Sequence, residues 1–283
     1  MNAFELYACL ENDFIKDGMS DDWSKNIVSI NEFVTDSYKK RFMGLVCDFS
    51  SEIKKVYTAV FPSDKVMQKI IDDDISDVLL FVHHPANWDI RKAPNVFQDM
   101  NFDLLRIFKE RRISVYNLHV PLDNYGDFST SNTFAKALGV DVRKAFGPYH
   151  GALCGVMGSL DVSSVDELKG LVEKILGHEV KVYDYGSSTF SNDCISVVGG
   201  GGVDLSILED VVITGSNVLV TGITNKNSHS EKAHEFAKNN KITLVGGSHY
   251  STEKFACIAM VDYFKNLGLD AEFVEDFYLL EDL

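Results

Sequence analysis

Short apolar runs alternate along most of this chain with longer segments in which apolar residues recur at helical spacing. Residues 78–82 read Val-Leu-Leu-Phe-Val, which is typical of a strand buried on both faces. Residues 63–73 instead place Val66, Ile70 and Ile71 on one face of a helix. The pattern predicts strands at 53–60, 77–82, 113–118, 179–183, 194–198, 218–220, 242–245 and 271–274, and helices at 63–73, 97–109, 130–138, 165–176, 229–239 and 253–267.

This alternation predicts an α/β protein with mostly parallel sheets flanked by helices. There is no low-complexity linker and no repeat of fixed period in the 283 residues. A chain of this length forms one large domain or two small ones, because domains run to roughly 100–200 residues.

The chain is acidic, and its charge narrows the classes of partner. It has 27 Lys and Arg against 42 Asp and Glu, a net charge of −15. That balance disfavours general nucleic-acid binding and adhesion to anionic membranes, although a small basic pocket for one phosphorylated metabolite stays open. Five scattered cysteines without a CxxC motif, no basic and apolar leader, and no apolar run near the ~20 residues of a membrane span predict a cytoplasmic protein.

The first candidate for chemistry is the segment Phe81-Val82-His83-His84-Pro85. Neighbouring side chains of a strand point to opposite faces, so the two histidines can serve one metal centre only if the chain turns there. The proline indicates that it does turn. The alternative is one capping histidine and one exposed histidine.

The second candidate is the pair His119 and Asp123, which also follows an apolar strand. The two residues are four apart, but Pro121 argues against an ordinary helix between them. A loop can still turn both side chains inward. The alternatives are that Asp123 caps the helix that begins near Thr130 or that it forms an Asx-turn.

The third candidate is the pair His249 and Glu253, in a Gly-Gly-Ser-His-Tyr-Ser-Thr-Glu segment that follows the strand at 242–245. At this spacing the two side chains share one helix face if the helix begins early enough, which is a common way to present two metal ligands. The alternative, favoured for this segment alone, is a Ser/Thr cap with a first-turn Glu.

The three segments together favour a metal centre. Each lies at the carboxyl end of a predicted strand, and in open α/β sheets these ends share one edge, where ligands bind. Four histidines, one aspartate and one glutamate would converge there: His83, His84, His119, Asp123, His249 and Glu253. Imidazole and carboxylate ligands suit zinc, iron or manganese, and bridging carboxylates suit a hydrolytic centre with two metal ions.

Four consecutive glycines, residues 199–202, follow the predicted strand at 194–198. Such a run can hold a phosphate through backbone N–H groups. It lacks the Lys-Ser/Thr pair of a P-loop, so a tight strand-to-helix turn is the favoured interpretation.

The order of these motifs resembles the type-2 homologues of GTP cyclohydrolase I, the NIF-three-like family. The match rests on His-His-Pro at 83–85, H-x-x-x-D at 119–123, Gly-Gly after residue 198, Thr-Gly at 221–222 and G-x-H-Y-x-x-E at 247–253. The resemblance implies a single two-lobed unit, with lobes near residues 1–125 and 126–283, and two divalent metal ions in the cleft between the lobes. It also implies a homohexamer.

The resemblance carries the family's metal ligands onto His83, His84, Asp123, His249 and Glu253, and His119 matches the family's additional histidine beside the site. The chain departs from the family where residues 40–45 read Lys-Arg-Phe-Met-Gly-Leu instead of Trp-Asp-Asn-x-Gly-Leu. The chain length leaves no room for an inserted regulatory domain of ~100 residues.

Three functions are consistent with these residues. The first is a metal-dependent hydrolase of a small phosphorylated or nucleotide-like substrate, with His119 as a candidate proton shuttle. The family name suggests GTP cyclohydrolase activity. The second is a non-catalytic protein that stores, delivers or senses metal. The third, an interaction module, leaves six ligand-type residues at three strand ends unexplained.

Overall fold

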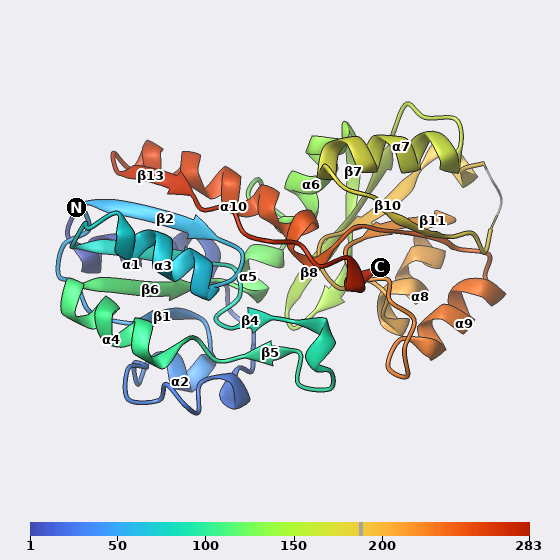
Figure 1. The fold of residues 1–283 in the computed structure, drawn as a ribbon. Coiled ribbons are helices and arrows are strands. Elements are labelled where there is room, and N and C mark those ends of the chain that lie inside the picture. The colour runs from blue at the N-terminus through green and yellow to red at the C-terminus, as the bar shows by residue number, and fades with distance from the viewer. Residues whose placement is uncertain (187–188) are drawn as a thin grey trace. The chain divides into compact units, whose positions relative to one another are not determined.

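The computed structural model describes residues 1–186 and 189–283 and has an α/β fold, which confirms the predicted class. The chain divides into two compact units. The first unit comprises Met1–Leu122 and Cys257–Phe277, and the second comprises Asp123–Ala256 and Tyr278–Leu283. Each unit is built on a twisted sheet with helices on both of its faces (Figure 1).

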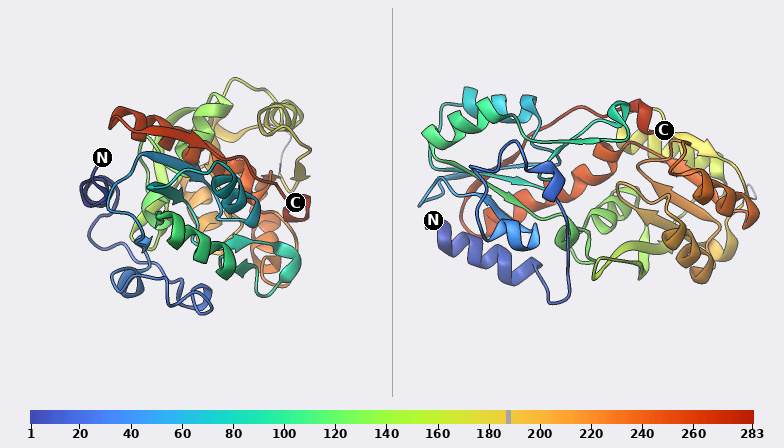
Figure 2. Two further views of the ribbon diagram at one scale, coloured as in Figure 1. Left: turned by 60° about the vertical axis from the view of Figure 1, so that its left-hand side comes forward. Right: turned by 90° about the horizontal axis from the view of Figure 1, so that it is seen from below.

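The sheet of the first unit has five strands and is mostly parallel, as the sequence predicts. Only β1 runs antiparallel to its neighbour β6. The last strand, β13, lies beside β2 although it is more than 200 residues away in sequence (Figure 1 and Figure 2). The order is β1 (Gly44–Cys47), β6 (Ile113–Asn117), β3 (Val78–Val82), β2 (Lys55–Ala59) and β13 (Asp270–Phe273).

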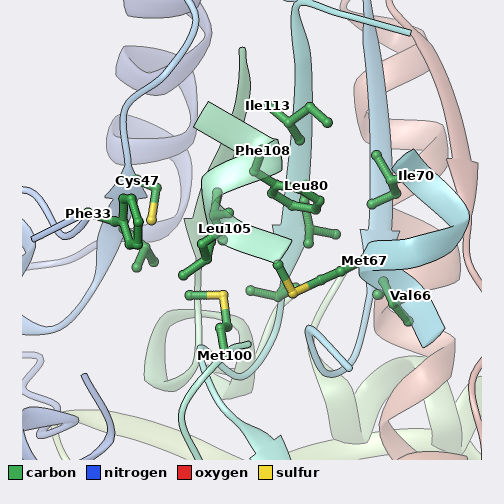
Figure 3. Close-up of a cluster of buried hydrophobic side chains, with 14 of the residues drawn as sticks. Phe33, Cys47, Val66, Met67, Ile70, Leu80, Met100, Leu105, Phe108 and Ile113 are labelled. Atoms are coloured by element: carbon green, nitrogen blue, oxygen red, sulfur yellow. The ribbon is translucent and has the colours of Figure 1, made fainter. Parts of the chain in front are cut away.

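The two faces of this sheet bury alternate side chains of the same strands. Leu80 faces the cluster of apolar residues under α3 (Asp64–Asp72) and α4 (Phe102–Arg111), shown in Figure 3. Its neighbour Phe81 faces the other side, where it packs against Phe264 at 5.5 Å between ring centroids. Since both faces are covered, every residue of β3 is buried, which explains its uninterrupted apolar run. The remaining elements are α1 (Ala3–Phe14), α2 (Tyr38–Arg41), the ribbon of β4 (Asn87–Trp88) and β5 (Phe97–Gln98), and the 3-10 helices η1 (Ser24–Asn26) and η2 (Ile90–Lys92).

The sheet of the second unit has six strands and is more antiparallel than the sequence predicts. Among the described residues of this unit, only β10, β11 and β12 pair in parallel. Strands β7 and β8 form a long hairpin that the apolar pattern did not reveal because β7 is largely exposed. In Figure 1, α6 and α7 cover the upper face and α8 and α9 the lower face. The strand order is β7 (Asp141–Tyr149), β8 (Ala152–Ser159), β10 (Ile195–Val198), β11 (Val218–Thr221), β12 (Thr243–Gly246) and β9 (Lys181–Tyr183). The other elements of this unit are α6 (Thr130–Leu138), α7 (Val165–Leu176), α8 (Leu205–Thr214), α9 (Glu231–Asn239), η3 (Ser191–Asp193) and η4 (Leu280–Asp282). Two further helices, α5 (Val120–Asp123) and α10 (His249–Asn266), have residues in both units.

Several helix starts differ from the prediction, and α9 begins at Glu231, two residues later than predicted. Helix α4 begins at Phe102 because Asn101 caps it, and the predicted first turn is the strand β5 instead. Helix α10 begins at His249, four residues earlier than predicted. By contrast α7 has the predicted ends, with Ser164 as its N-cap and Gly177 at φ 81° as its C-cap. Among the described residues, no helix combines the length and the apolar composition that crossing a membrane requires.

Helix α9 carries a buried histidine whose protonation is coupled to folding. His234 is 1% exposed, its Nε2 donates to the carbonyl of Thr224 at 3.1 Å, and its Nδ1 accepts from the hydroxyl of Tyr185 at 3.1 Å. Burial lowers the pKa of His234 below its ordinary value of 6.5, and the charge of Lys226 adds to the effect. The folded state therefore favours the neutral ring.

We predict that the protein loses stability as the pH falls below about 6.5, because the unfolded chain protonates this histidine before the folded one does. The free energy of unfolding continues to fall until the pH reaches the lowered pKa of His234 in the folded state. Its slope stays below about 1.4 kcal/mol per pH unit, the limit for one proton. Urea unfolding of the wild type and of His234→Gln between pH 7.5 and 5 checks this. The variant should show the shallower pH dependence, and parallel curves for the two proteins would contradict the prediction.

Candidate metal centre

The two adjacent histidines lie just past the end of β3, where the strand stops at Val82. The backbone N–H groups of His83 and His84 still donate to Ala59 and Val60, at 3.2 and 2.9 Å. Beyond this point the chain bends, and the two rings lie 4.4 Å apart between centroids at 71° between planes. Both side chains are buried, at 0% and 2% exposure, so the alternative of one exposed histidine does not describe this segment.

His119 lies at the end of the neighbouring strand β6, beside the same two histidines. Its ring centroid is 4.7 Å from that of His84 and 5.2 Å from that of His83. The segment after it forms one helical turn, α5, where a loop was expected. Pro121 is tolerated there because the first-turn N–H that it lacks has no partner inside a helix. One nitrogen of each of the three rings lies within 4.8 Å of the others, a spacing that can hold a metal ion.

Hydrogen bonds fix the orientation of two of these rings. Nδ1 of His83 lies 3.0 Å from the carbonyl oxygen of Leu118, and Nδ1 of His119 lies 3.0 Å from Oδ2 of Asp21. A carbonyl and a carboxylate only accept, so both histidines carry a proton on Nδ1. Histidines that bind metals are commonly held in this way.

The carboxylate of Asp21 is ionised in this environment. Burial alone would raise its pKa, but the electrostatic interaction and the hydrogen bond with His119, together with hydrogen bonds from Trp23 and from the Asp22 backbone, outweigh that effect. The pKa of Asp21 is therefore lower than its ordinary value of 3.8.

Aromatic side chains surround these histidines. The indole of Trp23 packs edge-on against His84 and His119, at 5.7 and 5.1 Å between centroids. Phe61 and Phe97 stack on His84, at 4.9 and 5.4 Å. No motif or periodicity in the sequence marks Asp21, Trp23 or the two phenylalanines as part of this group.

The third predicted pair lies in the second unit, on the first two turns of α10. His249 and Glu253 are 4% and 3% exposed, and Nε2 of the histidine lies 3.1 Å from Oε1 of the glutamate. The helix begins at His249 because Ser248 accepts the N–H of Ser251, at 3.1 Å, and Asp282 accepts the N–H of His249, at 2.9 Å. Glu253 is therefore in the second turn, not in the first turn that the capping alternative requires.

The glycine run forms the turn between β10 and α8, and it packs against Glu253 within the second unit. Gly200 has φ +67°, and a Cβ placed on it would lie 2.1 Å from Oε1 of Glu253. Its carbonyl accepts the N–H groups of Gly222 and Ile223, both at 2.9 Å. The missing side chain thus leaves room for a buried carboxylate, which agrees with the favoured interpretation of a tight turn.

We predict that Gly200→Ala destabilises the protein by about 1–3 kcal/mol and displaces the Glu253 carboxylate, because the new methyl group occupies the space of Oε1. Gly201→Ala is the matched control, since the atom nearest to its Cβ would be Cδ1 of Ile223 at an ordinary 3.7 Å. Urea unfolding measures the difference between the two variants. Equal stability of the two would show that the position of Glu253 does not depend on this glycine.

Asp123, the remaining predicted ligand, is the last residue of α5 and the first of the second unit. It is 8% exposed, and its Oδ1 accepts the hydroxyl of Thr130 at 2.8 Å. The N-cap of α6 is Ser129, so Asp123 is not the helix cap that was considered.

Each unit contains side chains of the kind that bind divalent metal ions. The first unit supplies three neighbouring imidazole nitrogens, and the second supplies a histidine and a carboxylate in contact and a further buried carboxylate. Neutral imidazole and ionised carboxylate are the ligands of zinc, iron and manganese. One of these donors, the carboxylate of Glu253, occupies the space that a side chain at Gly200 would fill.

Comparison with known proteins identifies the family. Residues 27–277 match the sequence profile of the Duf34/NIF3 (NGG1p interacting factor 3) family. The chain belongs to this family. It is 26% identical over 241 residues to the "GTP cyclohydrolase 1 type 2 homolog" of Borreliella burgdorferi, a match that covers 85% of this chain and 89% of that one. The protein of the same name from Pyrococcus horikoshii is 25% identical over 231 residues, covering 79% and 86%.

Solved structures similar to this DUF34/NIF3 chain share its fold. One, described as protein ybgI of unknown function, has a TM-score of 0.76 at 20% identity and covers 98% of this chain and 99% of its own. Another, the reduced HcgD of Methanocaldococcus jannaschii, has a TM-score of 0.68 at 21% identity and covers 98% of both chains. Asp21 and Trp23 precede the region that matches the family profile.

Proposed function

We propose that this DUF34/NIF3 protein binds two divalent metal ions and hydrolyses a small phosphorylated or nucleotide-like substrate. The proposed ligands are His83, His84, Asp123, His249 and Glu253. The observation that supports a metal centre most directly is the group formed by His83, His84 and His119 in the first unit, in which one nitrogen of each ring lies within 4.8 Å of the others. The name of the curated relatives, GTP cyclohydrolase 1 type 2 homolog, is in keeping with a nucleotide-like substrate.

The residues of the protein have distinct roles in this proposal. A bound pair of divalent ions supplies Lewis acidity and lowers the pKa of a bound water. His119, whose Nδ1 is held by Asp21, is the group that we propose takes a proton from water and returns one to the leaving group. The rings of Trp23, Phe61 and Phe97 limit the access of bulk water to His84.

The test combines metal analysis with an activity screen. Protein purified without chelators should contain about two ions per chain, and it is then assayed on nucleotides, including GTP, and on phosphoesters. His119→Gln should lower turnover by about 100-fold or more and retain the metal, because general acid–base groups contribute about 10²–10⁴-fold. His150→Gln, in the exposed β7–β8 turn, is the control.

The outcomes separate the candidate functions. Metal without turnover on any substrate would favour the second function, in which the protein stores, delivers or senses metal. Protein that binds neither zinc, iron nor manganese would refute both.

The family resemblance also leads us to propose a homohexamer. Light scattering at micromolar concentration should then give about six times the chain mass of 31.6 kDa. The charge of −15 per chain would have to lie mainly on outer faces, because like charges repel across an interface. A scattering mass equal to one chain would contradict this prediction.

A further inference from the structure

We infer that Asp21 is a positioning residue, which holds His119 beside His83 and His84 with a proton on Nδ1. The role of His119 in catalysis rests on the proposed function, but the state of its ring does not. Asp21 lies in an N-terminal segment that none of the sequence motifs includes.

The geometry of the contact supports this role. Oδ2 of Asp21 lies 3.0 Å from Nδ1 of His119, and the two side chains are only 8% and 12% exposed. An ionised carboxylate has no proton to donate, so the hydrogen of this bond belongs to the imidazole. Since little solvent reaches the pair, water cannot readily replace either partner. The ring is thus fixed in one tautomer and one orientation.

The carboxylate is itself held in place by its own segment. Oδ1 of Asp21 accepts the N–H of Asp22 at 2.9 Å, and Asp22 in turn accepts the N–H of Ser24 at 2.9 Å, at the start of η1. At the end of η1, Asn26 donates from Nδ2 to the carbonyl of Phe97 at 3.1 Å. These bonds fix the backbone on both sides of Trp23.

Trp23 places the same segment directly against the histidines. Its ring is 4% exposed and touches both His84 and His119 with its edge. The carboxylate and the indole therefore reach the histidine group together. The indole contact alone would be enough to cover the histidines. This segment also provides a hydrogen-bond acceptor for Nδ1 of His119.

The segment that contains Asp21 and Trp23 precedes the region matched by the family profile, which begins at residue 27. His119 lies inside the matched region, and the carboxylate that its Nδ1 contacts lies before it.

The tautomer matters for function. With the proton on Nδ1, the Nε2 of His119 can accept a proton or bind a metal ion, whereas with the proton on Nε2 it can do neither. Partners that fix a histidine in this way typically change metal affinity or activity by about 10–100-fold.

Asp21→Asn tests the inference with little change in shape. The amide can donate to Nδ1 and so move the imidazole proton to Nε2, while its size stays that of Asp. Solid-state nitrogen NMR of metal-free protein with ¹⁵N-labelled histidine rings reads the tautomer, and His119→Gln identifies the signal. Asp17→Asn, an exposed aspartate of the same segment, is the control for the loss of one negative charge.

The expected result is a proton on Nδ1 of His119 in the wild type and in Asp17→Asn, and loss of that tautomer in Asp21→Asn. Asp21→Glu, which keeps the carboxylate, should restore it in part. A wild-type His119 with its proton on Nε2, or identical spectra for the wild type and Asp21→Asn, would overturn the inference.

The same samples separate this inference from the proposed function. The tautomer is measured on metal-free protein, so this result does not depend on whether the metal centre exists. Zinc titration of the wild type then tests the metal centre, and turnover of Asp21→Asn should fall about 10–100-fold. If the wild type has the expected tautomer and binds no zinc, the proposed function fails and the role of Asp21 in holding the ring remains.

Discussion

His84→Gln is expected to weaken the binding of divalent metal by about 100-fold or more. His84 is 2% exposed, and its ring lies within 4.4 and 4.7 Å of those of His83 and His119. Loss of a residue that only orients a metal ligand typically lowers metal affinity by about 10–100-fold, so loss of a ligand itself should lower the affinity by more. Zinc titration and metal analysis after dialysis measure the change.

The matched control is His178→Gln, which alters another buried histidine. His178 donates from Nδ1 to the carbonyl of Glu179, accepts at Nε2 from Ser251, and stacks on Tyr278. It is not among the proposed ligands, so its replacement should leave zinc affinity unchanged. Equal zinc affinity of wild type and His84→Gln would remove the main support for the metal centre.

Stability gives a second readout of the same variant. A ligand that binds only the folded state at 100 times its dissociation constant adds about 2.7 kcal/mol to the free energy of unfolding. Wild-type protein should therefore gain stability when zinc is added, and His84→Gln should gain far less at the same zinc concentration. Comparison in the presence of chelator shows how much of the difference is due to packing alone.

The sequence predicts well those parts of the fold that burial alone determines. Strand β3 has both faces covered, so its five residues are all apolar and its ends are evident. Helix α7 has one apolar face, a serine cap and a terminal glycine, and its predicted bounds agree with the structure. In both segments the local preferences and the tertiary environment favour the same structure.

Other elements escape prediction because tertiary contacts decide them. Strand β7 is mostly exposed and is held by pairing with β8, so it has no apolar signature. The early start of α10 depends on Asp282, a residue 33 positions further on that accepts the N–H of His249. Sequence alone therefore left open whether His249 and Glu253 share a helix.

The candidate site shows the same division. His83, His84 and His119 were found because motifs at neighbouring strand ends of a parallel sheet must lie at one edge. Asp21 and Trp23 were not, because they reach the histidines from an irregular segment about 100 residues before His119. Gly200 gave a signal, the glycine run, but only the structure relates it to Glu253.

Glu253→Gln is expected to weaken metal binding by at least about 10-fold and to change the stability of the metal-free protein little, because the amide has the size of the carboxylate but lacks its charge. The carboxylate lies 3.1 Å from Nε2 of His249 in the second unit. We expect the loss of the Glu253 carboxylate to weaken the binding of the same metal ions as the loss of the His84 ring in the first unit. Zinc affinity is measured for each single variant and for the double variant.

The double variant decides whether the two units bind one shared centre. If His84 and Glu253 contribute to the same ions, the second substitution should weaken binding much less than it does alone, so the two free-energy changes should not add. Sites that act independently add to within about 0.5 kcal/mol. Additive changes would mean that each unit binds metal separately, and they would refute a dinuclear centre with ligands from both units.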